Sequence, residues 1–133
     1  MSGSRVLYAD TSALVKLVLT EPESSALLAY LDGRGGVVTS ALVTTELIRA
    51  VRRLQPDLEP RAHALIAGLT RIEVDREVLT TAAALSPSEM RSLDAIHLAT
   101  ALALGAELEA LVTYDARMAE AARAAGLRVE APA

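Results

Sequence analysis

The chain has 133 residues, of which 52% are hydrophobic and 23% charged, with a net charge of −4 and no cysteine. This composition predicts one compact domain with a substantial core, and it excludes a disordered chain, a disulfide framework and a thiolate metal site. The negative charge argues against a general nucleic-acid-binding surface, although it does not exclude an enzyme that acts on nucleic acid.

Strands and helices are predicted to alternate along the first half of the chain. A buried strand ends at Asp10, and Thr11 and Ser12 are typical residues for the start of a helix. Pro22 indicates a second helix start, and the glycine-rich residues 32–36 predict a turn. The predicted elements are a strand at residues 5–9, helices at 13–19 and 22–31, a strand at 37–39 and a helix at 41–54.

The second half continues this alternation. Its helices are interrupted by residues 55–57, by a Ser-Pro-Ser sequence at 86–88, and by Gly105 and Gly126. The predicted elements are a helix at 59–69, a strand at 71–74, helices at 76–85 and 92–104, a strand at 111–113, a helix at 116–125 and a strand at 127–129. Such alternation is typical of the α/β class, so we expect a doubly wound parallel β-sheet flanked by helices, with residues 1–133 forming one domain.

Two acidic residues follow predicted strands. Asp10 comes directly after the first strand, and Asp115 follows the strand at 111–113. Because doubly wound sheets place their sites at the carboxyl ends of the strands, both are expected at the same edge of the sheet. Each also suits the N-cap of the following helix, so the position alone leaves a purely structural role open.

Asp94 is the most informative acid, because the helix around it is apolar on nearly every side and is therefore predicted to be buried. Its polar residues Asp94, His97 and Thr100 are spaced three apart along one stripe. A buried carboxylate is costly unless it is paired or binds a metal ion. The alternative is an acid that interacts with the helix dipole, with Ser92 as the cap.

Glu46 and His97 are weaker candidates. Glu46 flanks the apolar stripe of its helix near the same edge of the sheet, where a glutamate at the border of the core is the simpler interpretation. His97 fits a ligand or a base, but a packed histidine with satisfied nitrogens is more common. Hydroxyls of Thr11, Ser12 and Thr113 are candidates to orient the carboxylates, although helix capping explains Thr11 and Ser12 nearly as well.

Asp10, Glu46, Asp94 and Asp115 together form a predicted acid cluster at one edge of the sheet. Converging carboxylates repel one another, and a hard divalent cation relieves that repulsion. Oxygen ligands suit Mg²⁺ or Mn²⁺. Such a cation polarises a phosphoryl oxygen and activates water for cleavage of a phosphodiester bond.

The chain resembles the PIN-domain ribonucleases, and within them the VapC-type toxins of bacterial toxin–antitoxin modules. The resemblance covers nearly the whole chain and rests on four segments in this order: VLYADTSALVKL at residues 6–17, SALVTTEL at 40–47, RSLDAIHLATAL at 91–102 and LVTYD at 111–115.

This resemblance implies a metal-dependent endoribonuclease with Asp10, Glu46, Asp94 and Asp115 as its catalytic acids. It implies that Asp10 and Asp94 hold Mg²⁺ or Mn²⁺, that Asp115 contributes to a second metal or acts through water, and that Glu46 positions water. It further implies a PIN-like fold, an RNA substrate, a homodimer and a cognate antitoxin protein.

Three alternative functions make different demands on the sequence. A phosphoacceptor receiver domain needs paired acids near the first strand and a lysine after a late strand, whereas the only lysine is Lys16. A haloacid dehalogenase phosphatase needs Asp-x-Asp where this chain has Asp-Thr-Ser. A catalytically silent PIN-like module that binds RNA or protein remains as the alternative. The chain is expected in the cytoplasm, because it shows no signal peptide and no membrane-length apolar run.

Overall fold

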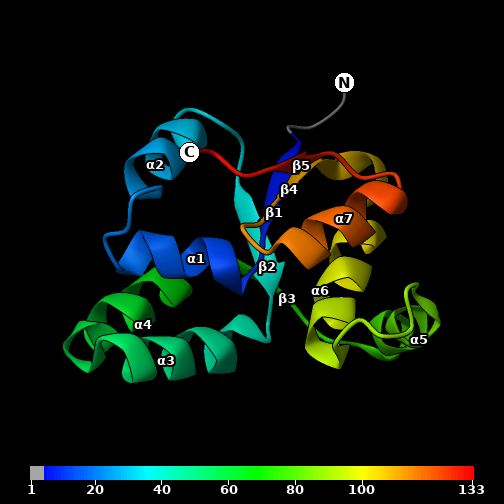
Figure 1. Cartoon of the computed structure of the whole chain (residues 1–133), viewed down its shortest axis with the longest axis horizontal. Helices are drawn as coiled ribbons and strands as arrows, with labels where there is room; N and C mark the ends of the chain where they lie inside the picture. Colours follow the sequence, from blue (N-terminus) through cyan, green and yellow to red (C-terminus); the bar gives the residue numbers. More distant parts are fainter. Residues whose placement is uncertain (1–4) are drawn as a thin grey trace.

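The computed structural model describes residues 5–133, which form a five-stranded sheet with helices on both faces (Figure 1). All strands are parallel, in the order β3-β2-β1-β4-β5. The central strand β1 therefore has β2 on one side and β4 on the other. The strands are β1 (Val6–Ala9), β2 (Val37–Ser40), β3 (Thr70–Ile72), β4 (Leu108–Val112) and β5 (Val129–Glu130).

The helices connect these parallel strands. Both faces of the sheet are covered, with α1 to α4 on one side and α5 to α7 on the other (Figure 1). The helices are α1 (Thr11–Val18), α2 (Ser24–Leu31), α3 (Val43–Leu54), α4 (Glu59–Ala67), α5 (Arg76–Ala84), α6 (Ser92–Ala103) and α7 (Ala116–Ala124), with short 3-10 helices η1 (Pro56–Leu58) and η2 (Gly105–Glu107). The doubly wound parallel fold predicted from the sequence is confirmed.

The central strand β1 separates two halves of the core. Leu7 and Ala9 pack with α1 to α4, whereas Tyr8 packs with α6, α7 and β4. This alternation follows from the two-residue period of side chains along a strand. Because both faces are covered, β1 is apolar throughout, as expected for a parallel sheet.

Some element boundaries differ from the predictions. β4 begins at Leu108 rather than at residue 111, because Leu108 and Ala110 already pair with β1. β3 covers Thr70–Ile72 rather than 71–74. Gly105 and Gly126 both have positive φ values, 54° and 91°, which explains why glycine ends the preceding helices. Among the residues described, no helix is long and apolar enough to cross a membrane.

Candidate active site

The pairing of β1 with β4 places Asp10 beside Thr113. Ala9 lies opposite Val112 in the sheet, so the residues that follow them are neighbours at the carboxyl edge. The Thr113 hydroxyl donates to Asp10 Oδ2 at 2.6 Å, and the Ser12 hydroxyl donates to Asp10 Oδ1 at 2.6 Å. Asp10 also caps α1 by accepting from the backbone N–H of Ala13. Asp10 therefore caps a helix and also lies where the sequence predicted the acid cluster.

Asp10 is almost completely buried, with 5% of its surface exposed. Burial raises the pKa of this carboxyl, and the hydrogen bonds from Ser12 and Thr113 offset only part of the effect. Within residues 5–133, no lysine or arginine forms an ion pair with it. Asp10 is therefore a buried acid with hydroxyl partners but without a charged one, which suits binding of a cation.

Asp115 and Asp94 lie near this carboxylate. Asp115 caps α7 through the backbone N–H groups of Arg117 and Met118, and its own N–H donates to Thr113 Oγ1 at 3.1 Å. Asp94 is half-buried in the first turn of α6. Burial raises the pKa of Asp94, and the negative charges of Asp115 and Asp10 raise it further. These three acids therefore interact electrostatically at one edge of the sheet.

Ser92 does not cap α6, contrary to the alternative considered for Asp94. The N-cap residue is Arg91, which makes no side-chain capping bond. Ser92 is instead the first residue of the helix, which leaves Asp94 at the third helical position. An acid there interacts favourably with the helix dipole, while burial and the negative charges of Asp115 and Asp10 raise its pKa.

Glu46 reaches the same edge of the sheet from α3. Its Oε1 accepts from the Thr11 hydroxyl at 2.8 Å and lies 2.6 Å from Nε2 of His97. Burial alone would raise the pKa of Glu46, but the hydrogen bond and electrostatic interaction with His97, together with the hydrogen bond from Thr11, outweigh burial and lower the pKa below its ordinary value. Glu46 is consequently ionised at neutral pH and belongs to a hydrogen-bonded group rather than to the solvated border of the helix.

His97 is packed and satisfied, in agreement with the simpler interpretation of the sequence. It is 2% exposed, and its Nδ1 lies 2.6 Å from the Tyr8 hydroxyl. Sequence reasoning did not identify Tyr8 as part of this arrangement. The signal was present, because Tyr8 is the one aromatic residue in an otherwise aliphatic strand and stands two residues before Asp10.

The chemistry of these side chains fits a hard divalent cation. Across residues 5–133, no three His, Asp or Glu side chains form a preorganised metal cage. Mg²⁺ does not require one, because it commonly keeps several waters and binds through one or two carboxylates together with substrate phosphates. The buried carboxylate of Asp10, with Asp94 and Asp115 near it, provides oxygen donors of this type.

Known proteins match this chain along nearly its whole length. The PIN-domain family model matches residues 7–124. Ribonuclease VapC35 of Mycobacterium tuberculosis is 50% identical over 131 residues, which cover 96% of this chain and 97% of that protein. The chain belongs to the PIN-domain family of VapC ribonucleases. Ribonuclease VapC46 of the same organism is 46% identical over 126 residues, covering 95% of this chain and 97% of the relative.

Solved PIN-domain structures share the fold at lower identity. The crystal structure of M. tuberculosis VapC20, described as a sarcin–ricin loop cleaving toxin, has a TM-score of 0.75 at 19% identity and covers 96% of this chain and 99% of that one. The FitAcB structure from Neisseria gonorrhoeae has a TM-score of 0.72 at 20% identity, with coverage of 95% and 97%. At these identities, the likeness establishes a common fold.

Proposed function

We propose that this chain is a metal-dependent endoribonuclease that acts as the toxin of a toxin–antitoxin pair. One observation carries the proposal: a chain that is 50% identical to a ribonuclease brings four separate acids to one edge of its sheet. Residues 1–133 are proposed to work as one PIN domain. RNA is the substrate class, and the reaction is hydrolysis of a phosphodiester bond.

The metal is proposed to be Mg²⁺ or Mn²⁺, held by Asp10, Asp94 and Asp115. When bound, such an ion polarises a phosphate oxygen and makes water a better nucleophile. Ser12 and Thr113 hold the two oxygens of Asp10 in place, which limits the reorganisation needed on binding. The raised pKa values of Asp10 and Asp94 support this assignment, because a cation removes the repulsion that raises the pKa of Asp94.

Glu46 is proposed to orient the attacking water. Its lowered pKa keeps the carboxylate ionised, so it is able to accept a hydrogen bond from water and thereby orient it. The hydrogen bonds that Glu46 forms with Thr11 and His97 both involve its Oε1. Oε2 has no hydrogen-bond partner among residues 5–133, which leaves it available to water.

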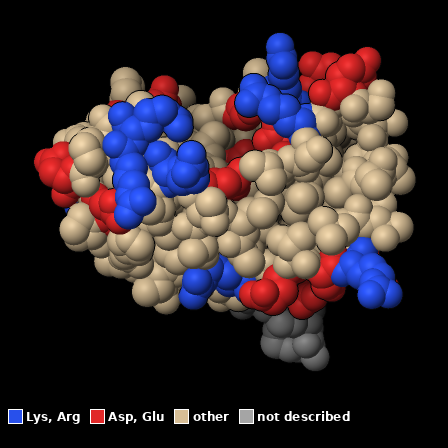
Figure 2. All heavy atoms as spheres, turned by 90° about the horizontal axis from the view of Figure 1, so that it is seen from below, with Lys and Arg blue, Asp and Glu red and all other residues tan. Residues whose placement is uncertain are grey.

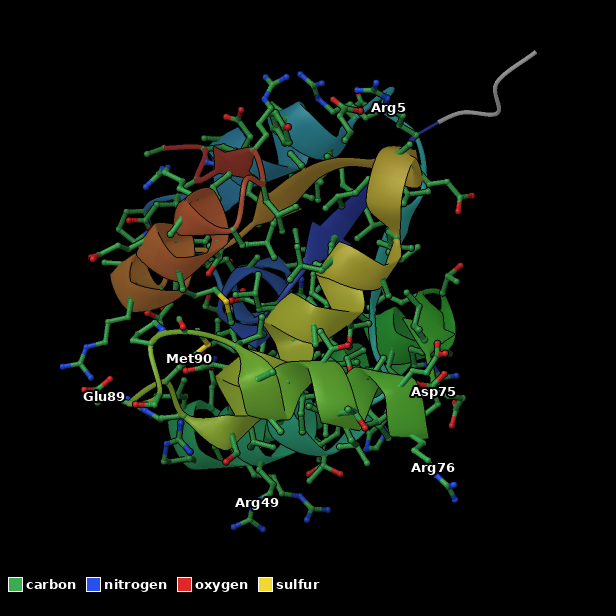
Figure 3. The ribbon with its side chains drawn as sticks, turned by 90° about the vertical axis from the view of Figure 1, so that its right-hand side faces the viewer. Arg5, Arg49, Asp75, Arg76, Glu89 and Met90 are labelled. Atoms are coloured by element: carbon green, nitrogen blue, oxygen red, sulfur yellow. The ribbon has the colours of Figure 1, made fainter. Side chains whose placement is uncertain are left out.

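Arginines next to Glu46 support RNA as the substrate. Arg49 and Arg53 follow Glu46 by three and seven residues, so they continue along the same side of α3. Both are exposed and form no ion pair within the described part of the chain, whereas Arg52 pairs with Glu59. Arg49 extends away from the ribbon in Figure 3, and Figure 2 shows basic side chains beside a hollow that contains acidic ones. Arginine suits contact with RNA phosphates.

The partners proposed for this chain are a small antitoxin protein and a second copy of the chain. Structures with the same fold include one described as a toxin–antitoxin complex from Klebsiella pneumoniae and one described as VapBC2 from Rickettsia felis bound to a promoter DNA fragment. The absence of cysteine is compatible with a reducing compartment, so we propose that the protein acts in the cytoplasm.

A cleavage assay on purified protein tests this function. Total RNA and single-stranded RNA oligonucleotides are incubated with Mg²⁺, with Mn²⁺ or with EDTA, and the new ends are sequenced. Cleavage that requires the metal and disappears in Asp94→Asn supports the proposal. Binding of the same RNAs without metal-dependent cleavage would instead identify a silent PIN-like binding module.

A further inference from the structure

The buried side chain of His97 connects two groups on opposite sides of its ring. The Tyr8 hydroxyl lies 2.6 Å from Nδ1, and Oε1 of Glu46 lies 2.6 Å from Nε2. The rings of Tyr8 and His97 pack edge to face, with centroids 5.9 Å apart. His97 is 2% exposed and Tyr8 is fully buried, so the hydrogen bond between them is shielded from water, and the one to Glu46 is partly shielded.

The position of the proton on His97 follows from its two partners. The carboxylate of Glu46 can only accept a hydrogen bond, so the ring nitrogen that faces it, Nε2, is the donor. The Tyr8 hydroxyl, which lies within hydrogen-bond distance of Nδ1, can donate to that nitrogen. A neutral ring that accepts at Nδ1 carries its proton on Nε2 and donates it to Glu46.

This chain of hydrogen bonds crosses the edge of the sheet. Tyr8 and His97 belong to the core half that packs against α6 and α7, whereas Glu46 comes from α3 in the other half. Thr11 at the start of α1 donates to the same oxygen of Glu46. Two donors from different helices therefore converge on Oε1, and together they restrict rotation of the carboxylate.

We infer that His97 is a positioning residue, which holds Oε1 of Glu46 so that Oε2 is free to orient the attacking water. Tyr8 acts one step further away, because its hydroxyl at Nδ1 and its packing against the ring fix the orientation of His97. Glu46 is the group that meets the reactants, and His97 touches neither RNA nor metal. This inference rests on the proposed ribonuclease function.

The first test is spectroscopic and requires neither metal nor RNA. Nitrogen NMR of the His97 ring in metal-free protein is expected to show a proton on Nε2 and none on Nδ1. The Tyr8→Phe variant keeps the aromatic ring but lacks the hydroxyl, so its Nδ1 resonance is expected to shift with the lost hydrogen bond while the proton stays on Nε2, where Glu46 accepts it. A proton on Nδ1 in the wild-type protein would overturn the inference.

The second test compares His97→Gln with His97→Asn. The amide nitrogen of Gln lies near the position of Nε2 and can still donate to Glu46, whereas the shorter Asn reaches only the position of Nδ1. Loss of a hydrogen bond that orients an active-site residue typically costs about 10- to 100-fold in activity. We expect Asn to lower kcat for RNA cleavage by this factor with little change in KM, and Gln to recover most of the loss.

Thermal unfolding of both variants provides the control, with kcat measured where both are fully folded. Equal kcat values for Gln and Asn would overturn the positioning role, because a purely structural histidine would not distinguish the two amides in this way. If the wild-type protein cleaves no RNA, the proposed function fails, while the NMR result still decides whether His97 holds Glu46.

Discussion

Replacing Asp94 by Asn removes one negative charge from the acid cluster while keeping the shape of the side chain. The variant tests metal binding without any RNA, because a ligand that binds only the folded protein raises its melting temperature. At a Mg²⁺ concentration about 100 times Kd, this stabilisation is about 2.7 kcal/mol. We expect wild-type protein to show it and Asp94→Asn to lose most of it.

The corresponding temperature shift follows from the chain length. An unfolding entropy of about 2.1 cal/mol/K per residue gives about 0.28 kcal/mol/K for the 133 residues. A stabilisation of about 2.7 kcal/mol therefore raises Tm by about 10 °C. Differential scanning fluorimetry with increasing Mg²⁺ or Mn²⁺ measures this shift directly.

The metal-free variant is expected to melt at a higher temperature than metal-free wild type. The pKa of Asp94 is raised on folding, mainly by burial and by Asp115. Below the pKa that Asp94 has in the unfolded chain, this carboxyl is protonated in both states and does not lower the free energy of unfolding. Above its pKa in the folded protein, its ionisation lowers the free energy of unfolding by the full amount. At pH 7 the wild-type protein carries that cost, and Asp94→Asn lacks it.

Asp75→Asn is the matched control. Asp75 caps α5 through the N–H of Val78 and lies beside Ala99 and Leu102 in the later turns of α6, away from Asp94. Asn and Asp are about equally good N-cap residues, so this variant is expected to keep both its stability and the rise of Tm on metal binding. Equal Mg²⁺-induced shifts in wild type and Asp94→Asn, with Asp75→Asn also unchanged, would refute the assignment of Asp94 as a ligand.

Three further predictions concern positioning, substrate binding and the core. Thr113→Val removes the hydroxyl that donates to the buried carboxylate of Asp10. It is expected to lower kcat for RNA cleavage and to reduce the free energy of unfolding in urea by about 1–3 kcal/mol. Thr113→Ser keeps a hydroxyl and is expected to retain both values. The double variant Arg49→Ala/Arg53→Ala is expected to raise KM for RNA while kcat is retained. It should also reduce the slope of log KM against log salt concentration by about 0.7 for each RNA phosphate that is no longer neutralised. The control is Arg76→Ala, at an exposed arginine of α5 (Figure 3), and an equal effect there would argue against a local RNA-binding role for Arg49 and Arg53. Leu98→Ala opens a cavity at a fully buried site on α6 and is expected to lower the free energy of unfolding by about 2–5 kcal/mol. A smaller loss in urea unfolding would indicate that the neighbouring core side chains close around the gap.

Much of the fold could be predicted because each helix and strand is marked locally. The helix predicted at 92–104 is observed at Ser92–Ala103, and the helix predicted to end at Leu54 does so. The start of β4 was missed because Leu108, Glu109 and Ala110 look ambiguous in isolation. Their strand conformation depends on pairing with β1, a contact with residues about 100 positions away.

The candidate site was predictable to different degrees. Asp10 and Asp115 follow strands, and Asp94 stands in an apolar helix, so local pattern was sufficient to single them out. The interaction of Glu46 with His97 joins residues 51 positions apart from opposite faces of the sheet. No periodicity in the sequence expresses such a contact, because it depends on how α3 and α6 meet at the sheet edge. The metal-binding role of the acids stays a prediction.

The pairing of β1 with β4 also bears on when the protein becomes active during synthesis. The central strand is among the first segments made, but one of its two neighbours is β4, and Thr113, which holds Asp10, comes directly after it. A chain still on the ribosome with only residues 1–107 exposed has three of the four acids but lacks the strand that brings the first of them into position. Asp10 therefore gains its hydrogen bond from Thr113 only after most of the chain has been translated, so we expect chains truncated before β4 to lack nuclease activity.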